Sequence, residues 1–379
     1  MFQLLQAMDG QQGLSCIFAR LISILTANAS AHLPYLLASP LYQIVALCNS
    51  SVASALKAVE RYNLPSNTKT YGDPQDLAND PDVQLVVCCV RVDKHYKLMM
   101  PALKAGKDAF VEWPLASNLE EAQEMLATAV ESGSRTIIGL QSRYSSVAQK
   151  VKQLMAENAI GKLLSSSLSY EVETFGDTDL PGVDYMSKKA AGANMFTIMF
   201  GHCADAVFSV LGAPHDISAT LSIQWPVVRF LTSDGSFDRM IERETPDHVM
   251  LQSTLKDGGA PVSISVRGGK PFKDAPALTW RILGTEGEIH ITSMALISFE
   301  LGNKLELYRY QEDVVKTIDL QIPEFLDSLP PTAINIGALY EAFAAGRDAV
   351  GFKDAVLLHR LITKMEKSTE DKTHEVLVA

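Results

Sequence analysis

The sequence lacks the positive charge and the cysteine pattern that several classes of protein require. Its 379 residues include 33 Lys and Arg against 44 Asp and Glu, which gives a net charge of −11. A chain this acidic does not attract phosphate backbones or anionic lipid headgroups, so we expect no direct nucleic-acid binding and no membrane binding. The five cysteines are odd in number and include no CxxC pair. They predict neither a disulfide framework nor a zinc site, and we expect no metal.

Long hydrophobic runs are also missing. The most apolar stretch near the start of the chain, residues 14–25, has about 12 residues and is too short to cross a bilayer. Asp9 stands where a signal peptide needs a positive charge, and Arg20 interrupts the run. We therefore expect a cytoplasmic protein that can also be nuclear.

The composition is that of a folded protein, with 47% hydrophobic and 20% charged residues. A chain of this length exceeds one ordinary core, which predicts two domains. We place the boundary near residue 145, where the pattern of strands and helices changes. The predicted domains are residues 1–145 and residues 146–379.

The first domain alternates short apolar runs with amphipathic stretches. Asn118 and Glu121 have the spacing of a capping box at the start of one helix. Alternating strands and helices predict a parallel sheet covered by helices, as in a Rossmann-type domain. The expected strands are residues 43–48, 84–89, 108–112 and 135–140, and the expected helices are residues 52–62, 95–105 and 118–130.

The second domain reads mostly as β structure with helices at its two ends. We expect an α+β domain with an open, largely antiparallel sheet, whose C-terminal helix over residues 333–367 packs back on the body. Its other predicted helices are residues 147–157 and 195–211, and its strands are residues 163–174, 216–225, 248–255, 261–266, 278–283, 288–292 and 305–310.

A dinucleotide-binding domain needs a glycine-rich turn after its first strand, and this turn is absent. A cofactor's pyrophosphate approaches the helix N-terminus over that turn. Here Thr26, Asn28 and Ser30 offer polar groups, but no glycine lies among them. Either another loop form holds the phosphates, or this stretch is not the family's native sequence, as a misread intron would produce.

The second strand also lacks the usual acid at its end. That acid accepts hydrogen bonds from the adenosine ribose, whereas this chain has Asn49 and Ser50 followed by Ser51. Neutral residues leave either NAD or NADP as the cofactor, with NADP(H) favoured. The alternative is a plain strand-to-helix turn in which Ser51 caps the helix.

Residues 86–116 resemble the Gfo/Idh/MocA oxidoreductases. In that family a strand ends near a His, a helix ends in Gly-Lys, and the next strand runs into Glu-Lys-Pro. His95, Glu112 and Trp113 occupy the matching positions, and the resemblance implies that they contact the cofactor. The family's lysine assists proton transfer at the nicotinamide, but Trp113 replaces it, and indole does not titrate.

A second family signature lies on the helix that enters the second domain. It aligns His202 and Asp205 with the family's last His and Asp, while Ile198 takes the place of an earlier Asp. The resemblance therefore leaves His202 as the catalytic candidate, because an imidazole can relay a proton. A satisfied core histidine is the alternative.

Two further candidates flank this signature. Arg143 follows the last strand of the first domain and either binds the ligand or seals the domain interface. Tyr185 lies in a loop that overlooks the nicotinamide in this fold, so we keep it as a second catalytic candidate.

Several motifs resemble one subgroup of the family, which includes the fungal galactose-regulon repressor. They are Val111–Ala116, Thr136–Arg143, Ala193–Met195, Pro246–Gln252 and Pro261–Gly269. The resemblance implies one of two functions. The first is an NAD(P)-linked oxidoreductase of fungal, including secondary, metabolism that acts on a small-molecule carbonyl, alcohol or imine. The second is a catalytically silent NAD(P)-binding regulator that docks an activator protein. It also implies a homodimer.

Overall fold

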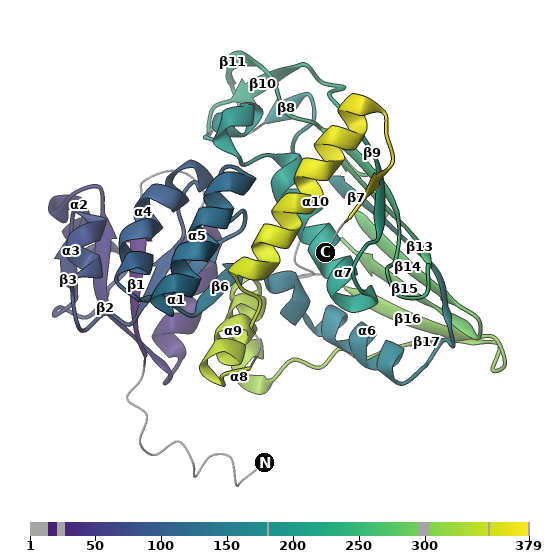
Figure 1. The fold of residues 1–379 in the computed structure, drawn as a ribbon, viewed down its shortest axis with the longest axis horizontal. Coiled ribbons are helices and arrows are strands. Elements are labelled where there is room, and N and C mark those ends of the chain that lie inside the picture. Colours follow the sequence, from purple (N-terminus) through teal and green to yellow (C-terminus); the bar gives the residue numbers. More distant parts are fainter. Residues whose placement is uncertain (1–13, 21–26, 180–181, 295–302, 348, 378–379) are drawn as a thin grey trace, which may run out of the picture.

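Two sheets, each built by one half of the chain, organise the computed structural model (Figure 1). It describes residues 14–20, 27–179, 182–294, 303–347 and 349–377, and the side chains from residue 31 onward. The predicted site residue Thr26 lies outside the described residues, as do the side chains of Asn28 and Ser30.

The first half alternates strands with helices, as its sequence pattern predicts. All four residues of β4 are buried, which explains their uniformly apolar sequence. Its elements are β1 (Leu14–Arg20), α1 (Ala27–Ala38), β2 (Tyr42–Asn49), α2 (Val52–Arg61), β3 (Lys69–Tyr71), α3 (Pro74–Ala78), β4 (Leu85–Cys88), α4 (Val92–Lys104), β5 (Asp108–Glu112), α5 (Leu119–Ser132) and β6 (Thr136–Gly139).

These strands form one parallel sheet in the order β3-β2-β1-β4-β5-β6. This is the Rossmann strand order. The chain adds strands toward one edge of the sheet from β1 to β3 and toward the other edge from β4 to β6, so the strand order switches between β1 and β4. In open sheets of this type, ligands bind outside the carboxyl ends of the strands at that switch. The candidate site is therefore expected beyond Arg20, Cys88 and Glu112.

The second half is built around a large sheet of nine strands in the order β17-β16-β15-β14-β7-β13-β12-β9-β18. All of its neighbouring strands are antiparallel except β7 and β13, so the predicted open, largely antiparallel sheet is confirmed. Its strands are β7 (Leu163–Val172), β9 (Asp216–Ser222), β12 (His248–Thr254), β13 (Pro261–Gly268), β14 (Leu278–Gly284), β15 (Gly287–Ser293), β16 (Lys304–Arg309), β17 (Val314–Thr317) and β18 (Glu375–Val376).

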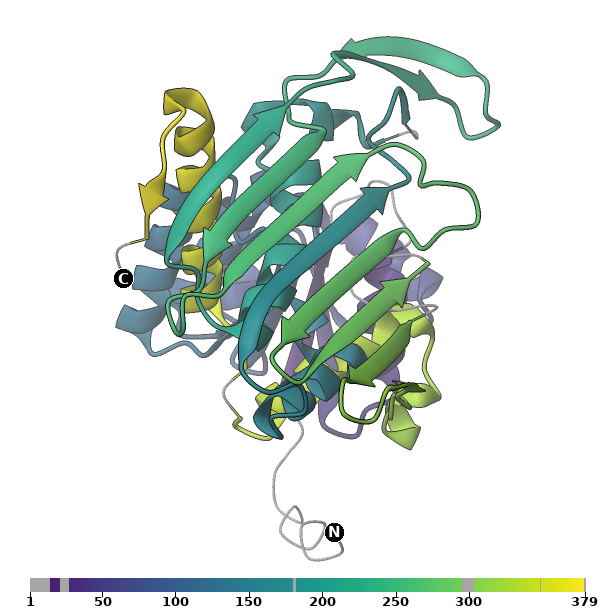
Figure 2. The ribbon, with the colours of Figure 1, turned by 90° about the vertical axis from the view of Figure 1, so that its right-hand side faces the viewer.

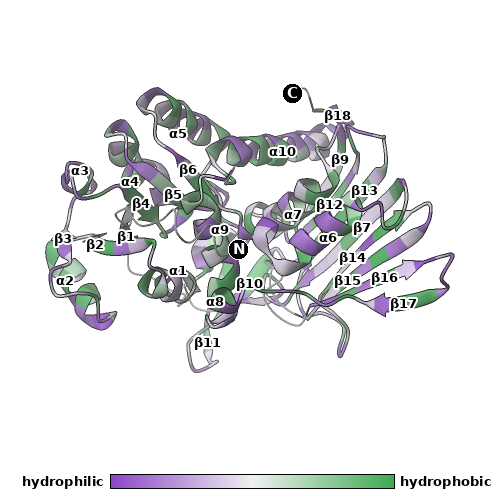
Figure 3. Cartoon of the chain, turned by 90° about the horizontal axis from the view of Figure 1, so that it is seen from below, coloured by the Kyte–Doolittle hydropathy of each residue, from purple (hydrophilic) through white to green (hydrophobic). Residues whose placement is uncertain are grey.

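One face of this sheet is covered by helices and the other is open (Figure 2). Side chains alternate along the strands, so that Val262, Ile264 and Val266 of β13 are buried while Ser263 between them is exposed. Figure 3 shows this alternation as green and purple along the strands. The homodimer that the resemblance implies stays a prediction.

Short helices and a small hairpin sheet fill the space beside the two sheets. The hairpin strands β10 and β11 were not among the strands expected from the sequence. These elements are η1 (Gln141–Tyr144), α6 (Ser146–Ala156), β8 (Thr178–Asp179), η2 (Asp184–Ser187), η3 (Lys189–Ala191), the π-helical turn η4 (Phe196–Phe200), α7 (Gly201–Leu211), β10 (Val227–Leu231) and β11 (Phe237–Glu242).

The C-terminal segment returns to the first half. The helix expected over residues 333–367 is two helices, α9 (Pro331–Ala344) and α10 (Phe352–Asp371), with the short α8 (Glu324–Asp327) before them. Gly346 interrupts the segment with a positive φ of 63°, a conformation that ends helices. In Figure 1, α9 lies beside α1, and α10 runs from the first sheet to the second.

The capping box expected at α5 is only half correct. The side chain of Asn118 accepts from the backbone N–H of Glu121, as predicted. The carboxylate of Glu121, however, accepts from the backbone N–H of Ser117 rather than from that of Asn118.

Within the part of the chain that the structure describes, no helix combines the length and the apolar character needed to cross a membrane.

A buried ion cluster joins the hairpin sheet to the large sheet. Arg243 donates to Asp179 at 3.2 Å and to Asp247 at 3.1 Å, and the three side chains are at most 2% exposed. Asp247 also accepts from the backbone N–H groups of Gln224 and Trp225. The cluster fixes the hairpin because each buried charge has a partner of opposite sign.

We expect Asp247→Ala to lower the free energy of unfolding by about 3–5 kcal/mol, because it leaves the Arg243 charge buried with one carboxylate fewer. Asp238, which pairs with Arg239 on the exposed hairpin surface, offers a matched control. Asp238→Ala should cost about 0–1 kcal/mol. Urea denaturation of both variants measures the difference, and equal losses would contradict the assignment.

Candidate functional site

Trp113, which the resemblance places at the family's lysine position, is firmly packed. It follows β5, precedes a cis-proline bond to Pro114, and is 4% exposed. Its indole Nε1 donates to the carbonyl of Thr197 at 2.8 Å. A Cβ at Gly201 would lie 2.5 Å from the same nitrogen, so the indole fits only against a glycine. These contacts join the first half to the start of α7.

His202 follows Gly201 on α7 and is buried. Burial lowers its pKa to about 4, although the nearby carboxylate of Glu112 acts in the opposite direction. Its Nδ1 is buried and has no hydrogen-bond partner in the part of the chain that the structure describes. A buried polar atom without a partner costs about 1–3 kcal/mol. An unsatisfied nitrogen of this kind is typical of a position where a ligand or ordered water binds.

His359 is a second buried imidazole next to Trp113 and was not predicted. It lies on α10, and its ring centroid is 4.9 Å from that of Trp113. Burial lowers its pKa to about 4, and its Nε2 has no hydrogen-bond partner among the described residues. No local motif marks His359, because more than 150 residues separate it from the predicted site residues in the sequence.

Arg143 ties together the helices that carry the two histidines. Its Nε and Nη2 donate to Asp205 of α7, at 2.9 and 2.6 Å, and its Nη1 donates to Asp354 of α10 at 3.0 Å. Burial works against the charge of the guanidinium, but the two carboxylates raise its pKa above the usual value. These contacts favour the interface role that the sequence left open for Arg143, and a cofactor contact stays a prediction.

Tyr185 packs across the boundary between the two halves. The guanidinium of Arg91, which precedes α4, lies 4.2 Å from the centre of the Tyr185 ring. Burial raises the pKa of the phenol, although the charge of Arg91 opposes this. The hydroxyl is therefore neutral at pH 7, and its catalytic role stays a prediction.

His95 connects the loop that holds the cis bond before Pro114 to the loop that follows β4. It is fully buried, and its Nδ1 and Nε2 each lie 3.0 Å from a backbone carbonyl, of Pro114 and Val90 respectively. Burial lowers its pKa, so the ring is neutral at pH 7. The geometry gives His95 a part in positioning Trp113, whereas its predicted contact with a cofactor remains untested.

Glu112 belongs to a polar chain that reaches α9. Its Oε1 lies 2.7 Å from Nε2 of His32 on α1, and Nδ1 of His32 lies 3.0 Å from the hydroxyl of Tyr340. Gly139 makes room for the carboxylate, since a Cβ there would lie 2.8 Å from Glu112 Oε2. His32 and Tyr340 were missed in the sequence because they lie on elements with ordinary helical patterns.

Asn49 and Ser50, the two residues predicted to contact the ribose, lie at the end of β2. Asn49 is buried, and its side-chain oxygen accepts from the backbone N–H of Ser50, which is exposed. Ser51 caps α2 and forms a capping box with Ser54, so the alternative role proposed for this turn is present. Contacts of Asn49 and Ser50 with a cofactor stay predictions.

Comparisons with known proteins find a matching family model for each half of the chain. Residues 25–140 match the family model of the oxidoreductase family with an NAD-binding Rossmann fold, GFO_IDH_MocA. Residues 147–293 match the model of the Gal80p C-terminal domain. The first half of the chain is therefore similar to the Gfo/Idh/MocA oxidoreductases and the second half to the Gal80p C-terminal domain. The two matches together confirm the resemblance of its motifs.

The similar proteins include both a dehydrogenase and regulators. The chain is 28% identical to dehydrogenase aclE of Aspergillus oryzae over 87% of each chain. It is 27% identical to the galactose/lactose metabolism regulatory protein GAL80 of Saccharomyces cerevisiae, over 89% of this chain and 88% of that one. The crystal structure of Gal80p from Kluyveromyces lactis superposes with a TM-score of 0.85 at 25% identity, covering 96% of this chain and 94% of that one.

We expect the free energy of unfolding to fall as the pH is lowered from about 6.5 toward 4. The pKa of His202 and that of His359 are each about 4 in the folded chain and return to 6.5 on unfolding. The unfolded chain therefore binds protons that the folded chain does not, and stability rises with pH across this window. His359→Phe should make the pH dependence shallower than that of wild type in urea denaturation. An unchanged slope in His359→Phe would contradict the prediction.

Proposed function

We propose that this chain is an NAD(P)-linked oxidoreductase of fungal, including secondary, metabolism. It moves a hydride between the nicotinamide and a carbonyl, alcohol or imine of a small molecule. The observation that carries this proposal is the buried Nδ1 of His202, which has no hydrogen-bond partner among the described residues and lies near Glu112. The NAD-binding Rossmann family and the similarity to dehydrogenase aclE support it.

His202 supplies the proton chemistry of this proposal. Its pKa of about 4 keeps the imidazole neutral at pH 7, so Nδ1 is able to accept a hydrogen bond from a substrate hydroxyl. In the oxidation direction, the hydroxyl proton passes to His202 while the substrate carbon loses its hydride and the carbonyl forms. The nicotinamide supplies the hydride acceptor when it is bound. The reverse reaction returns the proton to the carbonyl oxygen.

The end of β2 favours NADP(H) over NAD(H) in this proposal. Asn49 and Ser50 carry no negative charge that would repel a 2′-phosphate. We also propose that the protein acts in the cytoplasm.

Nucleotide binding should quench the fluorescence of Trp113, which we expect to lie beside the nicotinamide. Titration with NAD(H) and NADP(H) should give saturable quenching with at least one of the four nucleotides. Trp113→Phe should lose that signal, and Trp225→Phe, on the second half of the chain, should retain it. The absence of saturable quenching with all four nucleotides would contradict the cofactor assignment.

We expect His202→Asn to lower kcat by about 10²–10⁴-fold without changing nucleotide affinity, because it removes the proton acceptor. The substrate is found first by single-turnover oxidation of bound NADPH or NADH with a panel of carbonyls and imines. The wild-type rate of alcohol oxidation should not fall between pH 8 and 6, because the pKa of His202 is about 4. Full turnover in His202→Asn would refute the role.

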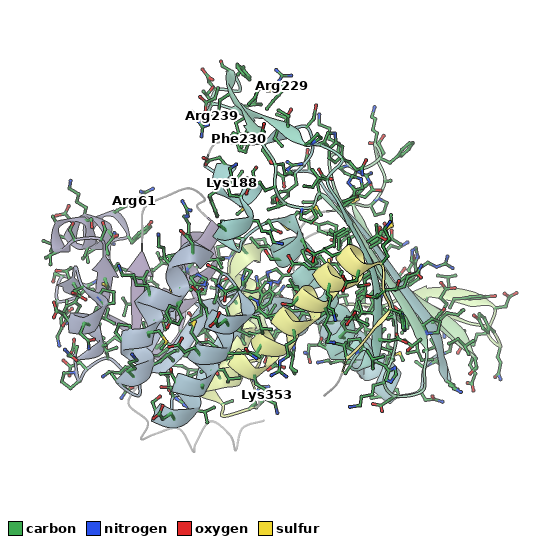
Figure 4. The ribbon with its side chains drawn as sticks, turned by 45° about the horizontal axis from the view of Figure 1, so that its top comes forward. Arg61, Lys188, Arg229, Phe230, Arg239 and Lys353 are labelled. Carbon is green, nitrogen blue, oxygen red and sulfur yellow. The ribbon has the colours of Figure 1, made fainter. Side chains whose placement is uncertain are left out.

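A second candidate function is a catalytically silent regulator that binds an activator protein. Trp113 and Ile198 in place of the family's lysine and aspartate favour it, as does the Gal80p-like C-terminal domain. Figure 4 shows Arg229 and Arg239 on the projecting hairpin, with Lys188 below them and Arg61 across on the first half. The exposed Phe237 and Met240 of β11 add an apolar surface beside these charges. Saturable nucleotide binding without turnover of any substrate would favour this candidate.

A further inference from the structure

We propose that His32, Cys89 and Glu112 form a binding site for a divalent transition metal ion, with Zn²⁺ as the preferred ion. One ligand atom from each residue lies within 4.8 Å of the other two. They come from α1, from the residue after β4 and from the end of β5. All three elements meet at the carboxyl-end edge of the parallel sheet, so the fold itself gathers them.

The charges of these groups suit a doubly charged cation in a buried position. His32 and Cys89 are buried, and the side chain of Glu112 is 18% exposed. A thiolate and a carboxylate together cancel two positive charges, which removes the large cost of burying an unpaired ion. The neutral imidazole adds a nitrogen ligand without changing this balance.

Neighbouring residues already orient two of the ligands. The hydroxyl of Tyr340 lies 3.0 Å from Nδ1 of His32 and is able to accept its proton, so that Nε2, which pairs with Glu112 in the absence of metal, is able to turn its lone pair to the ion. A partner on the second ring nitrogen is usual for metal-bound histidines. The space left by Gly139 lets the Glu112 carboxylate lie close to β6.

Binding requires only a small rearrangement. Nε2 of His32 and Oε1 of Glu112 are 2.7 Å apart in a direct hydrogen bond. Tetrahedral zinc with bond lengths near 2.0–2.3 Å places its ligand atoms about 3.3–3.6 Å apart. Rotation of the two side chains supplies this separation. In the absence of metal, His32 and Glu112 form this hydrogen bond with each other.

The ligand set selects among metals. A thiolate is too soft for Mg²⁺ or Ca²⁺, whereas sulfur, nitrogen and oxygen together suit Zn²⁺ and its spectroscopic substitute Co²⁺. Three protein ligands leave a fourth position for water or another small ligand. The sequence indicated no metal because these three residues share no local motif.

The test is a Co²⁺ titration of the full chain after treatment with a chelator. Wild type should develop the thiolate-to-cobalt absorption in the near ultraviolet and the strong visible bands of a tetrahedral ion, saturating at one equivalent. Zn²⁺ should displace both signals. Surface histidines alone give no thiolate band, so the signal reports the proposed site. No nucleotide or substrate is present, so the result is independent of the proposed function.

Two cysteine variants complete the experiment. Cys89→Ala should lose the thiolate band, while Cys88→Ala should keep it, because Cys88 is a buried neighbour outside the cluster. Glu112→Gln should keep the band with at least tenfold weaker binding. Circular dichroism shows whether each variant is folded. Absence of the band in wild type, or its persistence in Cys89→Ala, would overturn the proposal.

Discussion

The arrangement of the site depends on one partly buried ion cluster, Arg143 with Asp205 and Asp354. Arg143 lies where the chain leaves the parallel sheet, Asp205 lies on α7 and Asp354 on α10. Burial raises the pKa of Asp205 and would favour its neutral form, but the guanidinium beside it opposes this. Because Asp354 also accepts from the N–H of Gly351 at the start of α10, the same carboxylate fixes both that helix end and the arginine.

This cluster sets where His202 and His359 lie. His202 is one helical turn before Asp205, and His359 follows Asp354 on α10, so both imidazoles are carried by helices that Arg143 holds. Between the helices lies Trp113, which packs against Gly201 and the ring of His359. The site is thus shared by the first half of the chain, the helix that enters the second half and the C-terminal helix.

The sequence predicted the layers of this fold well, because strand and helix periods are local properties. It predicted β5 to the residue and the N-cap of α5, since both follow from neighbouring side chains. The helix expected over residues 195–211 instead begins with a π-helical turn, in which the Thr197 carbonyl accepts from the distant Trp113 indole. Such a turn alters which side of the helix His202 presents, and the local pattern does not contain that information. The partners of Arg143 and the proximity of His359 depend likewise on tertiary packing.

The tight fit of Trp113 also restricts how this protein can evolve. The indole nitrogen is bound by Thr197, its ring meets Gly201 without room for a methyl group, and His359 covers its face. A lysine at position 113 would leave a void and place an ammonium group among side chains shaped for a flat ring. Position 113 is therefore coupled to position 201 and to α10, so that a change at one of these places requires matching changes at the others.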